Sequence, residues 1–198
     1  MIYLASQSPQ RVMLLRRAGI PVTVVPSTAD EETIQSRHPQ ALALDRARHK
    51  AEGAVLPPGA TGLVLAADTV VALGLTLFGK PTDDADAVRI LSALQGTTHA
   101  VHTGHHGVRV VDGQRLGEAS AVASAKVTMR PLARAEIDGY LATGEHRGRA
   151  GAYAIQETGD RFVTEVQGSL ETVIGLQVAA VARLWRELTD TSLPGYVP

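Results

Sequence analysis

The segment Leu4–Arg11 (LASQSPQR) brings hydroxyl groups, backbone donors and a guanidinium to one turn of the chain. A short apolar strand runs into Ser6 and Ser8, and a helical pattern follows. Ser8 suits an N-cap, and Pro9 suits the first helical position. The free N–H groups of that helix start, together with Arg11, favour an anion such as phosphate. A well-capped turn without a ligand would use the same residues, so this segment alone leaves both interpretations open.

Asp68 is the strongest catalytic candidate, because it ends the apolar run Leu63–Ala67 and precedes Thr69. Carboxylates at the ends of buried strands in α/β folds commonly act as metal ligands or general bases. The acidic run 30–32 could supply a second carboxylate for a divalent cation opposite Asp68. The alternatives are a turn aspartate at position 68 and an exposed acidic loop.

Two lysines and a glutamine are candidates for substrate contacts. Lys80 lies in the Gly79–Pro81 loop, where it could neutralise phosphate charge. Gln156 ends the Arg149–Gln156 segment and offers a donor and an acceptor for the edge of a nucleobase. Lys50 lies on an expected helix of small residues. On local sequence alone, the favoured alternative is a solvated lysine at positions 80 and 50 and an incidental loop glutamine at position 156.

Four histidines, at 99, 102, 105 and 106, suggest a zinc site at first sight. In a strand, His99 and His105 lie on one face and His102 and His106 on the other, so the four do not converge easily. The chain has no cysteine that could add a thiolate ligand or form a disulfide. We therefore favour structural roles for these histidines.

These residues must be positioned by alternating strands and helices. The pattern predicts strands at 2–5, 22–26, 63–67, 69–73, 98–111, 115–129 and 161–167, and helices at 9–18, 39–56, 83–94, 132–142 and 172–188. A turn at Asp112-Gly113 joins the two long strands as an antiparallel hairpin, so the sheet should be mixed.

Composition narrows the class of protein. The 198 residues suit one domain, and aromatic residues make up only 4% of the chain, so the core should be mostly Ala, Val and Leu. A net charge of -1 argues against a dedicated nucleic-acid binder. We expect no signal peptide, because the sequence begins with a strand pattern and not with a charged segment and a long apolar run. We expect no membrane span, because no apolar run approaches about 20 residues. The lack of cysteine fits a cytoplasmic location.

Taken together, the segments resemble the Maf family of nucleotide pyrophosphatases. The matching segments, in order, are Leu4–Arg11, Asp30-Glu31, Lys50-Ala51, Ala67-Asp68-Thr69, Gly79-Lys80-Pro81, His99-Ala100-Val101, Thr143-Gly144-Glu145, Ala150–Gln156 and Gly168-Ser169. Each is short, but their shared order and spacing cover nearly the whole chain.

The resemblance implies one domain over residues 1–198, with an elongated mixed β-sheet flanked by helices. It also implies two lobes with a central cleft, similar to inosine triphosphate pyrophosphatases. The implied reaction is hydrolysis of a nucleoside triphosphate to the monophosphate and pyrophosphate, which removes unwanted or non-canonical nucleotides. A Mg²⁺ or Mn²⁺ ion and a homodimer are implied as well.

The resemblance also assigns site residues. The family's usual proton acceptor falls on Asp68, its acidic position on Glu31, and its two lysines on Lys50 and Lys80. Asp68 and Glu31 are the expected metal ligands. The residues expected to hold the phosphate end are Ser6, Ser8 and Arg11.

Base preference in this family is expected at positions 10, 69 and 156. Thr69 and Gln156 resemble the branch acting on dTTP and UTP more than the branch acting on 7-methyl-GTP. Gln10 fits neither, since arginine or tryptophan is usual there. Arg149 and Gln177 also depart from a usual lysine and proline. The alternatives are preference for 7-methyl-GTP or another modified nucleotide, and a non-catalytic nucleotide-binding regulator of cell division or septum formation.

Overall fold

The computed structural model describes residues 1–156 and 158–197, apart from the side chain of Glu32. In this part of the chain, seven strands form one mixed sheet in the order β2-β1-β3-β5-β6-β7, with β4 paired to β3. The chain divides into two compact units. Unit 1 comprises Met1–Asp68, Thr103–Ala123 and the stretch from Gly175 onward, and unit 2 comprises Thr69–His102 and Ser124–Ile174.

Unit 1 is built on parallel strand pairs. Strand β1 (Ile2–Leu4) pairs in parallel with β2 (Val22–Val24) and with the start of β3 (Gly62–Leu73), where Ile2 lies opposite Leu63. The helical elements of this unit are α1 (Pro9–Arg17), η1 (Glu31–Thr33), α2 (Pro39–Glu52) and α6 (Val178–Thr189). The first part of β3 is buried residue after residue, as expected for a strand covered on both faces.

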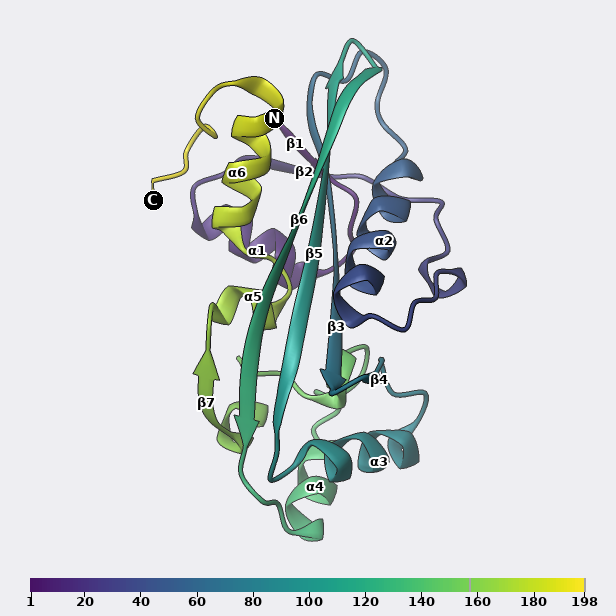
Figure 1. Ribbon diagram of the computed structural model, residues 1–198, viewed down its shortest axis with the longest axis vertical. Coiled ribbons are helices and arrows are strands. Elements are labelled where there is room, and N and C mark those ends of the chain that lie inside the picture. The colour runs from purple at the N-terminus through teal and green to yellow at the C-terminus, as the bar shows by residue number, and fades with distance from the viewer. Residues whose placement is uncertain (157, 198) are drawn as a thin grey trace. The chain divides into compact units, whose positions relative to one another are not determined.

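Helices α2 and α6 lie on opposite faces of β5 (Thr98–Val111), as Figure 1 shows. A Cβ atom added at Gly104 would meet the backbone of Ala43 on α2 at 2.4 Å. A Cβ atom at Gly107 would meet Leu184 and Leu188 of α6. Because side chains alternate along a strand, these two positions face opposite ways, and their lack of side chains lets both helices approach the sheet closely.

The core of unit 1 includes a cluster of small residues. Its buried members are Ala5, Val25, Ala51, Ala60, Val64, Ala66, Val108 and Val110. This agrees with the expected core of Ala and Val, and it brings the backbones of α2, β1 and β3 close together. Short distances between backbones are what allow side chains from these three elements to meet.

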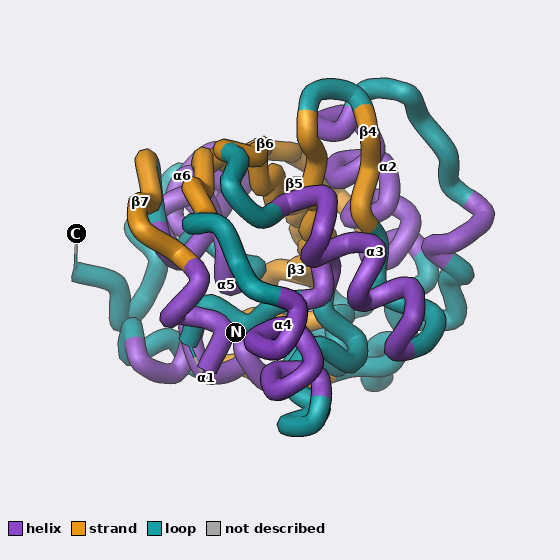
Figure 2. Tube along the Cα trace, turned by 90° about the horizontal axis from the view of Figure 1, so that it is seen from below, coloured by secondary structure: helices purple, strands orange, loops and turns teal. Residues whose placement is uncertain are grey.

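Unit 2 contains α3 (Asp84–Leu94) and α4 (Arg134–Leu141), which lie side by side in Figure 2. Helix α3 begins where the Asp83 side chain accepts a hydrogen bond from the Asp86 N–H at 2.7 Å. The remaining elements of unit 2 are β4 (Thr76–Phe78), η2 (Ala150–Ala152), η3 (Thr158–Phe162), β7 (Val163–Gln167) and α5 (Leu170–Ile174). Unit 2 also includes β3 from Thr69, β5 up to His102, and β6 (Gln114–Met129) from Ser124.

The core of unit 2 contains larger side chains than the cluster in unit 1. Its buried members are Val71, Phe78, Ala87, Ile90, Leu91, Leu94, Val101, Val127, Met129, Ile137, Tyr140, Leu141, Ala152, Tyr153, Ile155 and Phe162. Burial of each large aliphatic or aromatic side chain contributes roughly 2 kcal/mol. The helices and loops of this unit are therefore anchored by apolar contacts.

The expected mixed α/β class and the hairpin turn are confirmed. Asp112 and Gly113 both adopt positive φ, at 49° and 79°, which is the conformation of a tight two-residue hairpin turn. None of the helices in the described part of the chain combines the length and apolarity needed to cross a bilayer.

Several expected boundaries are wrong. The strands expected at 63–67 and 69–73 form one strand, β3, so Asp68 lies inside a strand and not at its end. The helix expected at 172–188 is broken into α5 and α6, because Gly175 adopts a φ of 126°.

Smaller differences affect other elements. The helix expected at 39–56 ends at Glu52, with Gly53 as its C-cap. The strand expected at 161–167 begins only at Val163, because η3 occupies the residues before it. Strand β2 ends at Val24 rather than 26, and β4 was not expected.

Gly104→Ala should destabilise the protein, because the new methyl group would overlap the α2 backbone and force the helix away from β5. We expect the free energy of unfolding to fall by about 2 kcal/mol, the usual cost of overpacking. Chemical denaturation would measure the change. Gly139→Ala on α4 is the matched control, since nothing lies within 4 Å of its added methyl group. Equal stability of the two variants would contradict the close approach.

Candidate functional site

The turn before α1 is organised by side-chain bonds among its own residues. The Ser8 N–H donates to Ser6 Oγ at 3.2 Å, and Arg11 Nη1 donates to the same oxygen at 3.0 Å. Ser8 is the N-cap and Pro9 the first residue of α1, as expected. The Ser8 hydroxyl does not cap the helix, however, because it donates to Gln10 Oε1 at 3.1 Å.

Arg11 is the cation of this turn, and it is only 9% exposed. Its Nε donates to the carbonyl oxygen of Gly175 at 2.9 Å. Burial lowers the pKa of Arg11 from its usual value, whereas the negative charge of Asp68 acts in the opposite direction. Arg11 is thus held by a backbone carbonyl and a serine hydroxyl, and its charge is coupled to the strongest catalytic candidate.

Lys50, Glu31 and Asp68 form a charged cluster within unit 1. Lys50 lies in the last turn of α2, Glu31 begins η1, and Asp68 lies on β3. The Lys50 ammonium lies 2.7 Å from Asp68 Oδ1 and also pairs with Glu31 Oε2. Lys50, a candidate from its place on a helix of small residues, thus has its ammonium directly between two of the expected acidic residues.

The second carboxylate oxygen of Asp68 has a different environment. Asp68 is 6% exposed, and its Oδ2 is a buried atom without a hydrogen-bond partner among the described residues. A buried carboxylate oxygen left unbonded is costly, so such an atom in a native fold calls for a water, an ion or a proton. Oδ2 therefore remains open to chemistry, while Oδ1 is fixed by Lys50.

Unit 2 carries the other expected residues. Thr69 follows Asp68 on β3 and is partly buried, whereas Lys80 and Gln156 are exposed. The loop of Lys80 is tied to the Arg149–Gln156 segment, because the Gly151 N–H donates to the Gly79 carbonyl at 3.1 Å. The expected roles of Lys80, Thr69 and Gln156 in substrate binding stay predictions.

The segment before Gln156 is held in a strained conformation. Ala152 is fully buried at a φ of 58°, a region that side chains other than glycine rarely adopt. The Tyr153 hydroxyl lies 2.9 Å from His99 Nε2, and the Ala154 N–H donates to the Tyr140 hydroxyl. Sequence reasoning missed the role of Tyr140, which no local motif marks.

Glu145 holds Thr158, which lies two positions after Gln156. The Glu145 carboxylate accepts hydrogen bonds from the Thr158 N–H at 2.9 Å and from the Thr158 hydroxyl at 2.6 Å. Gln156 thus lies between a strained buried segment and a clasped one.

The histidines of β5 each have their own partner, and they do not form a metal site. His102 bonds Ser124, and His106 bonds Ser120, both at 2.7 Å. Within the described ranges, no group of three or more His, Asp or Glu side chains could hold a metal ion. Burial lowers the pKa of His99 and of His105 to about 4, so both rings are neutral at pH 7.

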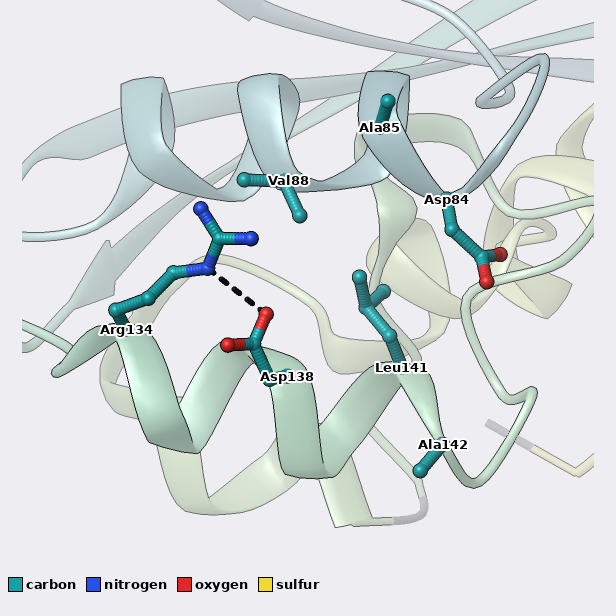
Figure 3. A pocket seen from close by; sticks show the side chains of 7 residues that line it. All are labelled: Asp84, Ala85, Val88, Arg134, Asp138, Leu141 and Ala142. Atoms are coloured by element: carbon teal, nitrogen blue, oxygen red, sulfur yellow. Dashed lines mark hydrogen bonds and ion pairs between the residues drawn. The ribbon is translucent and has the colours of Figure 1, made fainter.

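A hollow of about 490 Å³ lies between α3 and α4 in unit 2 (Figure 3). Its polar lining is formed by Asp84, Asp138 and Arg134, and Arg134 donates to Asp138 at 2.8 Å. Asp84 in turn lies 3.0 Å from His146 Nε2. Two carboxylates and a neutralised arginine would repel a phosphate chain, so this hollow is not where we place a triphosphate.

An α/β fold with a buried arginine at a serine-rich helix start and a lysine held between two carboxylates defines a candidate anion-handling enzyme site. The chain matches the family model described as "Maf-like protein" over residues 1–188, and it belongs to this family.

Named relatives extend the comparison. The chain is 45% identical over 186 residues to a dTTP/UTP pyrophosphatase of Anaeromyxobacter dehalogenans (strain 2CP-C), covering 93% of this chain and 92% of that one. It is 40% identical over 189 residues to a dTTP/UTP pyrophosphatase of Carboxydothermus hydrogenoformans, covering 96% and 97%. A solved HAM1 protein from Coxiella burnetii is 16% identical with a TM-score of 0.46, covering 96% and 98%. A likeness that low supports no statement about activity.

The protein should lose stability as the pH falls from 7 to 4. Between the ordinary histidine pKa of 6.5 and the folded value of about 4, the unfolded chain binds protons that folded His99 and His105 do not. The contribution of these two histidines to the free energy of unfolding is therefore fully present above pH 6.5. It decreases by up to about 3 kcal/mol per histidine as the pH approaches 4.

Urea denaturation at several pH values would measure this loss. His99→Gln should reduce the slope, since glutamine does not titrate and can still bond the Tyr153 hydroxyl. His38→Gln changes an exposed histidine and is the control. An unchanged slope in His99→Gln would show that burial of His99 does not govern acid stability.

Proposed function

We propose that this chain hydrolyses nucleoside triphosphates to the monophosphate and pyrophosphate, with dTTP and UTP as its preferred substrates. The observation that carries the proposal is the pairing of Lys50 with Asp68 and Glu31, together with an Asp68 Oδ2 that has no hydrogen-bond partner in the described part of the chain. The relatives named dTTP/UTP pyrophosphatase support the choice of reaction and substrates.

In this proposal, the triphosphate binds at the turn before α1. Arg11 and Ser6 already form one bonded pair there, and the Ser8 N–H is fixed by Ser6 Oγ. Lys50 and Lys80 would offset further phosphate charge, as the family resemblance implies. A preorganised set of cations and N–H groups stabilises charge as it develops in phosphoryl transfer, which is the main source of acceleration in such reactions.

A divalent cation, Mg²⁺ or Mn²⁺, fits the residues present. Lys50 carries one positive charge against the two carboxylates of Asp68 and Glu31, and carboxylate oxygens are the ligands that hard cations prefer. Two protein carboxylates are too few for a complete cage, which agrees with an ion that also uses substrate phosphates. When bound by Asp68 and Glu31, the ion would supply charge neutralisation and polarisation of the phosphate.

Asp68 is proposed as the proton acceptor. Its Oδ1 is fixed by Lys50, so Oδ2 can take a proton from a water that attacks the α-phosphorus. A new oxygen–phosphorus bond forms to the monophosphate, and the bond between the α-phosphorus and the bridging oxygen breaks. The departing group is pyrophosphate, which carries that oxygen and its electron pair.

Base preference is proposed to depend on Thr69, Gln156 and Gln10. Gln156 presents both a donor and an acceptor, as a pyrimidine edge requires. In this chain, the Ser8 hydroxyl donates a hydrogen bond to Gln10 Oε1, so its proton is already engaged without a substrate. From the family resemblance we further propose a homodimer that works in the cytoplasm, and sedimentation of the purified protein would test the dimer.

Asp68→Asn should reduce kcat for dTTP at least about a hundredfold, because the amide keeps the shape but loses the base. Release of pyrophosphate in the presence of Mg²⁺ would measure turnover. Asp45→Asn, which changes an exposed aspartate on α2, is the matched control and should retain activity. Near-normal turnover in Asp68→Asn would contradict the assigned role.

The same assay separates the enzyme from a nucleotide-binding regulator. Binding of triphosphates by the wild-type protein without release of pyrophosphate would favour the regulator. A panel that includes dTTP, UTP and 7-methyl-GTP would also reveal preference for a modified base.

Gln10→Arg should raise kcat/KM for dTTP and UTP by about tenfold, because it adds a charge-assisted contact and releases the Ser8 hydroxyl. Gln7→Arg places the same charge at an exposed position of the same turn and is the control. Equal gains in the two variants would show that charge alone, and not position 10, matters.

A further inference from the structure

Arg11 is fixed by a carbonyl group from the far end of the chain. Its Nε donates to Gly175 O at 2.9 Å, and this bond is buried. An arginine side chain has many rotamers, so a fixed Nε–H limits the orientations that the remaining guanidinium donors can adopt. Whatever holds the Gly175 carbonyl in place therefore acts on Arg11.

The segment 175–177 is anchored at two points within unit 1. Leu176 is fully buried, and the Gln177 N–H donates to His105 Nε2 at 2.9 Å. Gly175 itself adopts a φ of 126°, which turns the chain between α5 and α6. The buried Leu176 side chain holds the segment against the core. The hydrogen bond fixes the orientation of its backbone, since the Gln177 N–H must point at one ring nitrogen of His105.

His105 is suited to this bond by its surroundings. It is fully buried on β5, and burial together with the charges of Arg11 and Arg183 lowers the pKa of its ring, whereas the backbone of Ala121 and Thr103 acts in the opposite direction. A neutral ring that accepts at Nε2 must carry its proton on Nδ1. His105 thus differs from His102 and His106, which bond serine hydroxyls.

We propose that His105 is a positioning residue for phosphate binding, which holds the Gly175 carbonyl on Arg11 through the backbone amide of Gln177. The order of contacts is His105 to Gln177, along the chain to Gly175, then to Arg11 and Ser6. The proposal rests on the proposed function only for the identity of the ligand that Arg11 meets.

Position 177, where this chain has glutamine and the family usually has proline, allows the bond from the Gln177 N–H to His105 to be tested. Proline has no backbone N–H, so Gln177→Pro removes the donor, and the native φ of -95° lies close to the range of proline. His105→Val removes the acceptor and leaves the N–H unbonded. The double variant removes both partners, so its loss of melting temperature should be smaller than the sum of the two single losses.

The effect on substrate binding is measured as KM and kcat for dTTP in the presence of Mg²⁺. His105→Val should raise KM about fivefold with kcat within about twofold, because only ligand positioning is impaired. His106→Val, a substitution of the next buried histidine on the same strand, is the control and should lower stability without raising KM. Equal KM values for the two variants, or strict additivity in the melting-temperature cycle, would overturn the proposal.

A final measurement is independent of hydrolysis. Hydrogen exchange of the Arg11 Nε–H, followed by NMR, should be faster in His105→Val than in His106→Val. Equal exchange rates would overturn the role of His105 even if the enzyme is active. If the wild-type protein hydrolyses no triphosphate, the proposed function fails, and faster exchange in His105→Val would still support the link to Arg11.

Discussion

The charge of Lys50 determines how the centre of unit 1 can be built. Its ammonium joins α2 to β3 and to η1, because it pairs with both Asp68 and Glu31. Two carboxylates that approach one another in a partly buried place repel strongly unless a cation lies between them. The position of Lys50 therefore allows Asp68 and Glu31 to lie together beside a strand that is mostly apolar. Removing the cation would leave the two carboxylates to repel one another without compensation.

The backbone supports this arrangement through small residues. Ala51 of α2 and Ala66 of β3 belong to one buried cluster, so the two elements approach each other closely on either side of the charged group. The Ser27 hydroxyl donates to the Lys50 carbonyl at 2.8 Å, which ties the chain before η1 to the end of α2. The close packing of α2 against β3 limits the access of water, and a low local dielectric strengthens the attraction between Lys50 and its partners.

Much of this could be predicted from the sequence, and the exceptions have physical causes. Apolar runs and glycines located most helices and the long hairpin, and the order of short motifs indicated the Maf family, which the family match confirms. Asp68 was expected at the end of a strand because a charged residue normally interrupts a buried one. The compensating Lys50 is 18 residues away in sequence, so local patterns could not reveal that the strand continues.

The break between α5 and α6 was missed for a similar reason. A continuous helix would satisfy the apolar spacing of residues 172–188, whereas the interaction that accompanies the break is the bond from Gln177 to His105, 72 residues earlier. The strained backbone at Ala152 is likewise supported by contacts of Tyr153 and Ala154 with distant residues. Long-range hydrogen bonds to backbone groups leave no periodic signal in a sequence.

The division of the chain into units has a consequence for how the protein is made. Unit 2 is complete once residue 174 has been synthesised, whereas unit 1 includes the last segment of the chain as well as the first. On the ribosome, the N-terminal strands and α2 must therefore wait, with apolar surface uncovered, until α6 emerges to close over β5. Residues 1–68 and the stretch from Gly175 onward thus complete the same unit, and the first of these segments is translated well before the second.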